Sequence, residues 1–204
     1  MSKFLFNGPD NATYTVVLAH GAGAPMDSVF MERTAIGIAG RELRVARFEF
    51  PYMVKRREDG KRRPPDRVSV LIEAYLQVAT ELGPKNLVIG GKSMGGRIAS
   101  MIADEAGVAG LICLGYPFHP PGKPEKPRTT HLESLETPTL ILQGERDPFG
   151  KKEEVTSYSL SPSIQVEYLP DGDHDLKPRK ASGRTHEDNR NAAIAAAHAF
   201  VEDL

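Results

Sequence analysis

Two kinds of hydrophobic pattern alternate along this chain, and together they predict an ordered series of strands and helices. Runs that are apolar almost throughout occupy residues 86–91, 108–114 and 138–142, and a short β-rich run covers 14–19. Continuous apolar runs are typical of strands buried on both faces of a parallel sheet. Residues 43–50 and 164–169 instead alternate apolar and polar positions, which predicts less buried strands and places the second at the outside of the sheet.

Helical spacing fills the gaps between these runs. In residues 68–82 apolar side chains recur every three or four positions, as in an amphipathic helix, and a second helical pattern covers 98–106. An alanine-rich stretch from 185 to 204 starts with Thr185 and Asp188 in capping-box spacing, which predicts a C-terminal helix. Because strands and helices alternate, we expect an α/β fold with a mostly parallel central sheet and helices on both faces.

Two stretches interrupt the alternation, and both are expected to be loops. Residues 51–67 carry seven basic and three acidic side chains, and residues 115–130 are rich in proline. Neither stretch is long enough to form a domain of its own, so we expect a single domain over residues 1–204.

Composition narrows the possible functions. The chain has 204 residues, of which 40% are hydrophobic and 26% charged, as in ordinary globular domains. A formal net charge of −1 argues against nucleic acid or an acidic membrane as the main partner. Cys113 is the only cysteine, which excludes an intramolecular disulfide and a cysteine-based zinc site. Without a secretory signal pattern or an apolar run of about 18 residues, the expected location is the cytoplasm.

The strongest chemical signal is a G-x-S-x-G pattern, Gly91-Lys92-Ser93-Met94-Gly95. The pattern follows a predicted strand and precedes helical spacing, so Ser93 is expected at a sharp strand-to-helix turn with its Oγ exposed. The alternative is the end of a phosphate-binding P-loop, which requires glycine at position 86, where this chain has Asn86. We therefore interpret Ser93 as a nucleophile.

A nucleophilic serine needs a histidine base and a carboxylate that orients it. Asp147 follows the run at 138–142 and His174 follows the run at 164–169, in the order typical of hydrolases with this motif. Loops that follow parallel strands meet at one edge of the sheet, so the three residues are expected to converge. Glu145 is the alternative to Asp147 as the carboxylate that orients the histidine. The alternatives are that Asp147 only begins a turn and that His174, among three aspartates, is an exposed loop residue or a weak metal ligand.

The oxyanion that forms during nucleophilic attack needs two N–H donors. Met94, directly after Ser93, is expected to supply one, and Ala22, in the glycine-rich turn after residues 14–19, the other. Five side chains are expected to line the substrate pocket: His20, Lys92, Tyr52, Tyr116 and His119.

Positive charge near the motif bears on the substrate. Lys92, Arg97 and the basic stretch 55–63 are compatible with an anionic substrate, such as a carboxylated or phosphorylated acyl compound. The alternative is that the stretch is a solvated charged loop and that Arg97 pairs with a carboxylate.

Several segments resemble the α/β-hydrolase superfamily, and they extend over nearly the whole chain. These segments are residues 20–23, 48–53, 90–97, 115–123 and 173–177. They are most similar to a compact, dienelactone-hydrolase-like group that includes testis-expressed protein thirty. The resemblance implies the α/β-hydrolase fold and a Ser93–Asp147–His174 triad. Only about 22 residues separate Gly115 from Pro138, so no cap domain is expected.

Together these features favour a serine hydrolase that cleaves an ester, thioester or related acyl bond of a small molecule, without a metal or cofactor. Acyl transfer would use the same groups. The alternative from another class is a non-catalytic binding or scaffold module on the same fold, with the basic stretch and residues 117–127 as partner surfaces.

Overall fold

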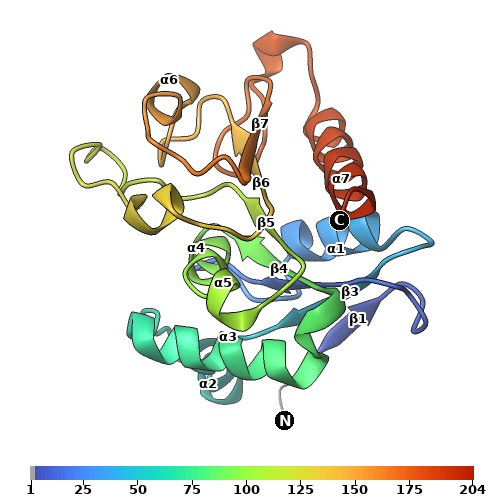
Figure 1. Cartoon of the computed structure of the whole chain (residues 1–204). Helices are drawn as coiled ribbons and strands as arrows, with labels where there is room; N and C mark the ends of the chain where they lie inside the picture. The colour runs from blue at the N-terminus through green and yellow to red at the C-terminus, as the bar shows by residue number, and fades with distance from the viewer. Residues whose placement is uncertain (1–2) are drawn as a thin grey trace.

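A seven-stranded sheet forms the centre of the computed structural model, which describes residues 3–204 (Figure 1). The strand order is β1-β3-β2-β4-β5-β6-β7, and all neighbours are parallel except the antiparallel pair β1 and β3. The strands are β1 (Leu5–Asn7), β2 (Thr15–Ala19), β3 (Arg44–Phe48), β4 (Leu87–Lys92), β5 (Gly110–Leu114), β6 (Thr139–Gly144) and β7 (Ile164–Leu169). The expected mostly parallel sheet is therefore confirmed.

Burial follows the hydrophobic pattern of the strands. Every residue of β4, β5 and β6 is buried, as the continuous apolar runs predict. β7 forms the edge of the sheet and only Leu169 in it is fully buried, which confirms the prediction of an outer strand. β3 is more buried than its alternating pattern suggests, because β1 and β2 flank it on both sides.

Helices cover both faces of the sheet. α1 (Val29–Ala39) and α7 (His186–Glu202) pack side by side over one face (Figure 1). The core on the other face is closed by α2 (Pro51–Asp59), α3 (Val68–Leu82), α4 (Met94–Ser100) and α5 (Ala103–Ala106). α6 (Lys152–Val155) and the 3₁₀ turns η1 (Pro84–Asn86), η2 (Thr130–Glu133) and η3 (Lys180–Ser182) complete the elements.

The stretch 51–67 is not entirely a loop, and that expectation was wrong for residues 51–59, which form α2. Pro51 occupies the first turn of the helix, where a missing N–H costs nothing, and Gly60 ends it in a left-handed conformation. Tyr52 and Met53 are buried in the core, while the charged residues remain on the outside. Burial of these two side chains stabilises the helix. In the sequence, the many charged residues of this stretch leave no recognisable helical pattern.

The structure also differs from the prediction in the bounds of one helix and in two elements that were not predicted. The helical pattern at 98–106 corresponds to two short helices, α4 and α5, and α4 begins earlier than expected, at Met94. β1 and α1 were not predicted. α1 nevertheless has a regular buried stripe of Met31, Ala35 and Ile38, which packs on the sheet.

The segment between β5 and β6 contains only the short turn η2, so no cap domain covers the sheet. None of the helices within residues 3–204 is long and apolar enough to cross a membrane.

Tyr75 of α3 joins its helix to the sheet through its buried hydroxyl. The hydroxyl oxygen lies 2.9 Å from Gly90 N and 3.1 Å from Val17 O, so it can accept from one strand and donate to the next. We expect Tyr75→Phe to lower the free energy of unfolding by about 1–3 kcal/mol, because buried backbone groups lose a partner. Urea denaturation measures this change. Tyr14→Phe is the control, since the Tyr14 hydroxyl makes no hydrogen bond within residues 3–204, and a similar loss there would contradict the explanation.

Candidate active site

Ser93 lies at the sharp turn between β4 and α4, at the carboxyl edge of the sheet. Its φ of 51° falls in the left-handed region that non-glycine residues seldom adopt, and the side chain is only partly buried. Its N–H donates to the carbonyl of Leu114, at the end of the neighbouring strand β5, over 3.0 Å. The predicted strand–turn–helix geometry is therefore present, with a strained serine at its apex.

The glycines of the motif permit this turn by close packing. A Cβ atom on Gly95 would lie 2.5 Å from the carbonyl oxygen of Ala19 in β2, and one on Gly96 would lie 2.7 Å from that of Gly91. Real Cβ atoms do not approach a carbonyl so closely, so α4 can begin directly against the sheet only with glycine at these positions.

Ser93, His174 and Asp147 come together from three separate loops. His174 Nε2 lies 2.8 Å from Ser93 Oγ, and His174 Nδ1 lies 2.7 Å from Asp147 Oδ2. The Asp147 carboxylate is fully buried, while 21% of the His174 side chain is exposed. The imidazole thus connects a half-buried hydroxyl to a buried carboxylate, in the order expected from the sequence.

Two residues that sequence reasoning did not single out hold Asp147. Gln143 Nε2 donates to Asp147 Oδ2 over 3.0 Å, and the backbone N–H of Phe149 donates to Oδ1 over 2.8 Å. The Gln143 side chain is itself fixed by Tyr116, whose N–H donates to Gln143 Oε1 over 2.8 Å. The Phe149 ring also packs against the imidazole of His174, with 4.3 Å between centroids. A polar residue at the buried end of an apolar strand, as Gln143 is, was the available signal.

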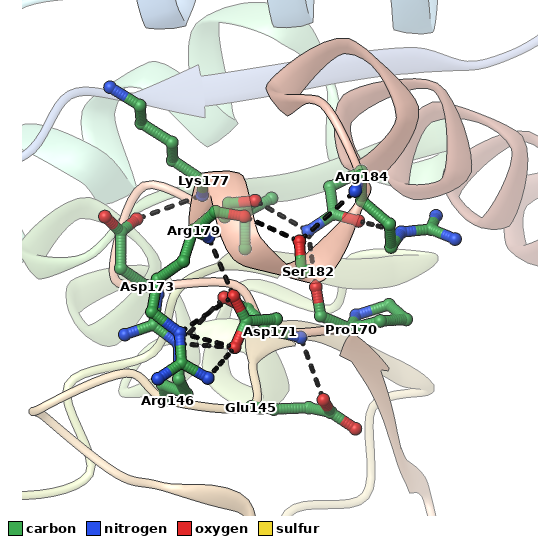
Figure 2. Close-up of polar contacts among 11 residues, drawn as sticks. Glu145, Arg146, Pro170, Asp171, Asp173, Lys177, Arg179, Ser182 and Arg184 are labelled. Atoms are coloured by element: carbon green, nitrogen blue, oxygen red, sulfur yellow. Dashed lines mark hydrogen bonds and ion pairs between the residues drawn. The ribbon is translucent and has the colours of Figure 1, made fainter.

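The loop that carries His174 is fixed by a network around Asp171 (Figure 2). Asp171 pairs with Arg146 at 2.9 Å and with Arg179 at 2.5 Å, and its N–H donates to Glu145 over 2.8 Å. The Arg179 guanidinium holds the pKa of Asp171 at about 2, so this carboxylate stays charged across the ordinary pH range. Glu145 is therefore engaged in this network, and it is not the carboxylate that contacts His174.

Lys92 also binds the loop that carries His174. Its ammonium group donates to the carbonyl of His174 and lies 3.3 Å from Asp175 Oδ1, and the side chain is only 9% exposed. Burial lowers the pKa of this lysine. The Lys92 side chain thus contacts the backbone of His174 and is not directed to a substrate pocket.

His20 and Tyr52 arrange the turn that contains Ala22. His20 Nε2 lies 3.2 Å from the backbone N of Phe50, which donates to it, so His20 Nδ1 carries the proton and donates to Gly21 O over 2.7 Å. Burial lowers the pKa of His20, which favours this neutral form. The Tyr52 hydroxyl donates to the carbonyl of Ala22 over 3.0 Å. Both side chains are almost fully buried, so they fix the turn rather than line a pocket.

The other two expected pocket residues are also in the interior. His119 is 2% exposed and pairs with Glu154 at 3.2 Å, and Tyr116 is completely buried. All five side chains expected to line the pocket are thus buried. Within residues 3–204, no group of three or more His, Cys, Asp or Glu side chains is arranged to hold a metal ion.

The two residues expected to donate to an oxyanion follow β2 and β4 in the chain. Met94 is the first residue of α4, so its N–H has no partner within that helix. Ala22 is exposed in the turn fixed by His20 and Tyr52. These are the residues that the sequence selected as donors.

Comparison with known proteins agrees with this geometry. A family model described as an alpha/beta hydrolase domain matches residues 12–202. A solved structure of a serine hydrolase homologue from Coxiella burnetii shares 18% identity with a TM-score of 0.69, covering 98% of this chain and 90% of that one.

Two further solved structures are similar in the same way. A serine hydrolase without a lid from Xanthomonas campestris is 17% identical with a TM-score of 0.69, over 98% of this chain and 88% of that one. A dienelactone hydrolase from Anabaena variabilis is 21% identical with a TM-score of 0.71, over 95% of this chain and 88% of that one. At these identities the likeness concerns the fold.

Proposed function

This chain belongs to the α/β-hydrolase family, and from that premise we propose that it is a serine hydrolase that cleaves an ester, thioester or related acyl bond through a covalent acyl-enzyme. The observation that carries the proposal is the continuous hydrogen-bonded series from Ser93 through His174 to Asp147. A binding module has no need of a strained serine, a base within hydrogen-bond reach and a buried carboxylate together.

In the first half-reaction, Ser93 Oγ attacks the carbonyl carbon while His174 Nε2 accepts the serine proton. Asp147 keeps the other imidazole nitrogen protonated and stabilises the imidazolium that forms. The N–H groups of Ala22 and Met94 donate to the oxyanion. When the bond to the leaving group breaks, His174 gives its proton to the departing oxygen or sulfur.

In the second half-reaction, His174 takes a proton from water, and the resulting hydroxide attacks the acyl carbon. Collapse of this second oxyanion releases the carboxylic acid, and the proton returns from His174 to Ser93 Oγ. The enzyme is restored without a metal or redox cofactor, because every proton transfer uses the same imidazole. The absence of a cap leaves the partly exposed Ser93 open to substrates of the surrounding solution.

Fluorophosphonate labelling tests for the activated serine. We expect one covalent adduct on the wild-type protein by intact mass spectrometry, none on Ser93→Ala, and much slower labelling of His174→Ala, because a serine without its base is a weak nucleophile. Circular dichroism establishes that each variant is folded. A folded wild-type protein that forms no adduct would contradict the proposal and favour the binding-module alternative.

A further inference from the structure

Two of the seven basic residues in the stretch 51–67 form ion pairs with neighbours. Arg57 pairs with Asp27 at 2.5 Å and with Glu49 at 2.6 Å, and Arg63 pairs with Asp59. The other five form no ion pair within residues 3–204, but all except the half-buried Arg56 are exposed to solvent, where water and salt screen their charge. The stretch therefore gives little reason to expect an anionic substrate there. Lys92, the other cation near the motif, is bound to the His174 loop.

Arg97 differs from these exposed residues because part of its guanidinium is buried without a partner. Its Nε atom is buried without a hydrogen-bond partner, and its guanidinium makes no ion pair within residues 3–204. The expectation that Arg97 pairs with a carboxylate is thus not met. Arg97 lies one helical turn after Ser93, since its N–H donates to the carbonyl of Ser93 over 3.0 Å.

A second unpaired cation lies beside Arg97. Burial lowers the pKa of Arg128, and after burial the Arg97 charge lowers it further, so the two guanidinium groups repel each other. The Tyr116 phenol partly offsets this effect, and Arg128 forms no ion pair with a carboxylate within residues 3–204. Two cations that are partly buried and close together without an anion are unfavourable, and a bound anion removes both penalties.

Neutral hydrogen-bonding side chains connect the two arginines. Tyr116 donates from its hydroxyl to the carbonyl of Arg128 over 3.1 Å and lies 3.4 Å from His131 Nε2. His131 Nε2 lies 2.9 Å from the Ser100 hydroxyl, and Ser100 in turn donates to the carbonyl of Arg97 over 2.8 Å. Burial, followed by the charge of Arg97, lowers the pKa of His131, which favours its neutral form. The cluster is therefore held in place with its charge concentrated on the two guanidinium groups.

The cluster is built on the same elements as the Ser93 site. Arg97 belongs to α4, which begins directly after Ser93, and the backbone of Tyr116 binds the Gln143 side chain that holds Asp147. We infer that Arg97 and Arg128 bind an anionic group, a carboxylate or a phosphate, at the far end of the substrate whose acyl bond Ser93 attacks. This inference rests on the proposed function and names its substrate class. Guanidinium groups suit such ligands because they donate two parallel hydrogen bonds to carboxylate or phosphate oxygens.

A matched pair of esters tests the inference. 4-Nitrophenyl hemiglutarate ends in a carboxylate, and 4-nitrophenyl methyl glutarate has the same acyl chain without the charge. For the wild-type protein we expect a kcat/KM for the anionic ester at least about 10-fold higher. Arg97→Gln and Arg128→Gln should each lower kcat/KM for the anionic ester by about 10- to 100-fold and change that for the neutral ester by less than about threefold, because only the anion loses a charged partner.

Controls separate charge recognition from structural damage. Arg97→Lys, which retains the charge, should keep part of the preference, and Arg63→Gln, at an exposed and remote ion pair, should keep all of it. Inhibition by free glutarate and by inorganic phosphate distinguishes the two anions, and the one that binds here should lose potency in Arg97→Gln.

The outcomes also separate the two proposals. Equal turnover of both esters by the wild-type protein, or equal losses for both in the arginine variants, would overturn the anion site and leave the serine hydrolase standing. No turnover of either ester, together with no fluorophosphonate adduct, would overturn both.

Discussion

Ser93→Ala is expected to lower kcat for a neutral ester such as 4-nitrophenyl butyrate by about 10⁴- to 10⁶-fold with little change in KM, because it removes the atom that forms the acyl-enzyme. The variant should remain folded. Alanine has the same Cβ as serine, so the strain of the left-handed backbone at φ 51° is unchanged, and only the hydrogen bond to His174 is lost. Steady-state kinetics with release of 4-nitrophenol measures the effect.

Ser157→Ala is the matched control for this measurement. Ser157 is exposed after α6, and its hydroxyl donates only to the carbonyl of Glu154. It should retain wild-type kcat within experimental error. If Ser93→Ala instead hydrolyses the ester as fast as the control, the observed turnover does not use Ser93.

The second large effect is expected for Asp147→Asn, with a loss of about 10⁴-fold in kcat. The orientation of the new amide follows from its neighbours. The N–H of Phe149 donates to Oδ1, so the amide oxygen stays there and the NH₂ group occupies the place of Oδ2. That NH₂ group faces His174 Nδ1 and donates to it, which moves the imidazole proton to Nε2. An imidazole protonated at Nε2 cannot accept the proton of Ser93.

The same substitution is expected to reduce stability. Gln143 Nε2 donates to Oδ2 of Asp147 in the wild-type protein, and it would meet an NH₂ donor in the variant. Gln143 cannot simply rotate, because its Oε1 accepts from the N–H of Tyr116. Gln143 Nε2 retains the carbonyls of Tyr116 and Gly150 as acceptors, so the donor left without an acceptor is the second hydrogen of the new amide at position 147. Such a buried donor costs about 1–3 kcal/mol, which thermal or urea unfolding can detect.

Glu145→Gln is the control for the acid, and it also decides between the two carboxylates that the sequence offered. The Glu145 carboxylate accepts from the backbone N–H of Asp171 and from the ammonium group of Lys152, and the structure shows no contact between Glu145 and His174. We expect kcat to change by less than about threefold. A loss in Glu145→Gln as large as in Asp147→Asn would mean that the loop rearranges and that Glu145 orients the base.

Hydrophobic spacing predicted the helices and strands whose apolar side chains recur at regular intervals and are buried against the core. The helix at 68–82 and the strand at 164–169 have the bounds that the pattern indicates, because every third or fourth side chain of one, and alternate side chains of the other, contact the sheet core. α2 was hidden because its anchoring to the core depends on only two buried side chains, Tyr52 and Met53. A short buried segment in a charged stretch leaves no clear period in the sequence.

The sequence by itself determined the type of fold and the chemical groups at the edge of its sheet. Ser93, Asp147 and His174 each follow an apolar run, and parallel strands direct the loops after such runs to one place. Their convergence therefore follows from the position of each residue directly after a strand of the parallel sheet.

Only the tertiary structure decided what each charged side chain meets. Lys92 binds the carbonyl of His174, which is 82 residues away in the chain, while Arg97 forms no ion pair within residues 3–204 and its charge lowers the pKa of Arg128. Burial and pairing of charges depend on short distances between segments far apart in sequence, and a pattern along the chain does not contain those distances. This is why the sequence grouped Arg97 with Lys92 and the basic stretch 55–63, whereas their contacts in the structure differ and we propose an anion site only at Arg97 and Arg128.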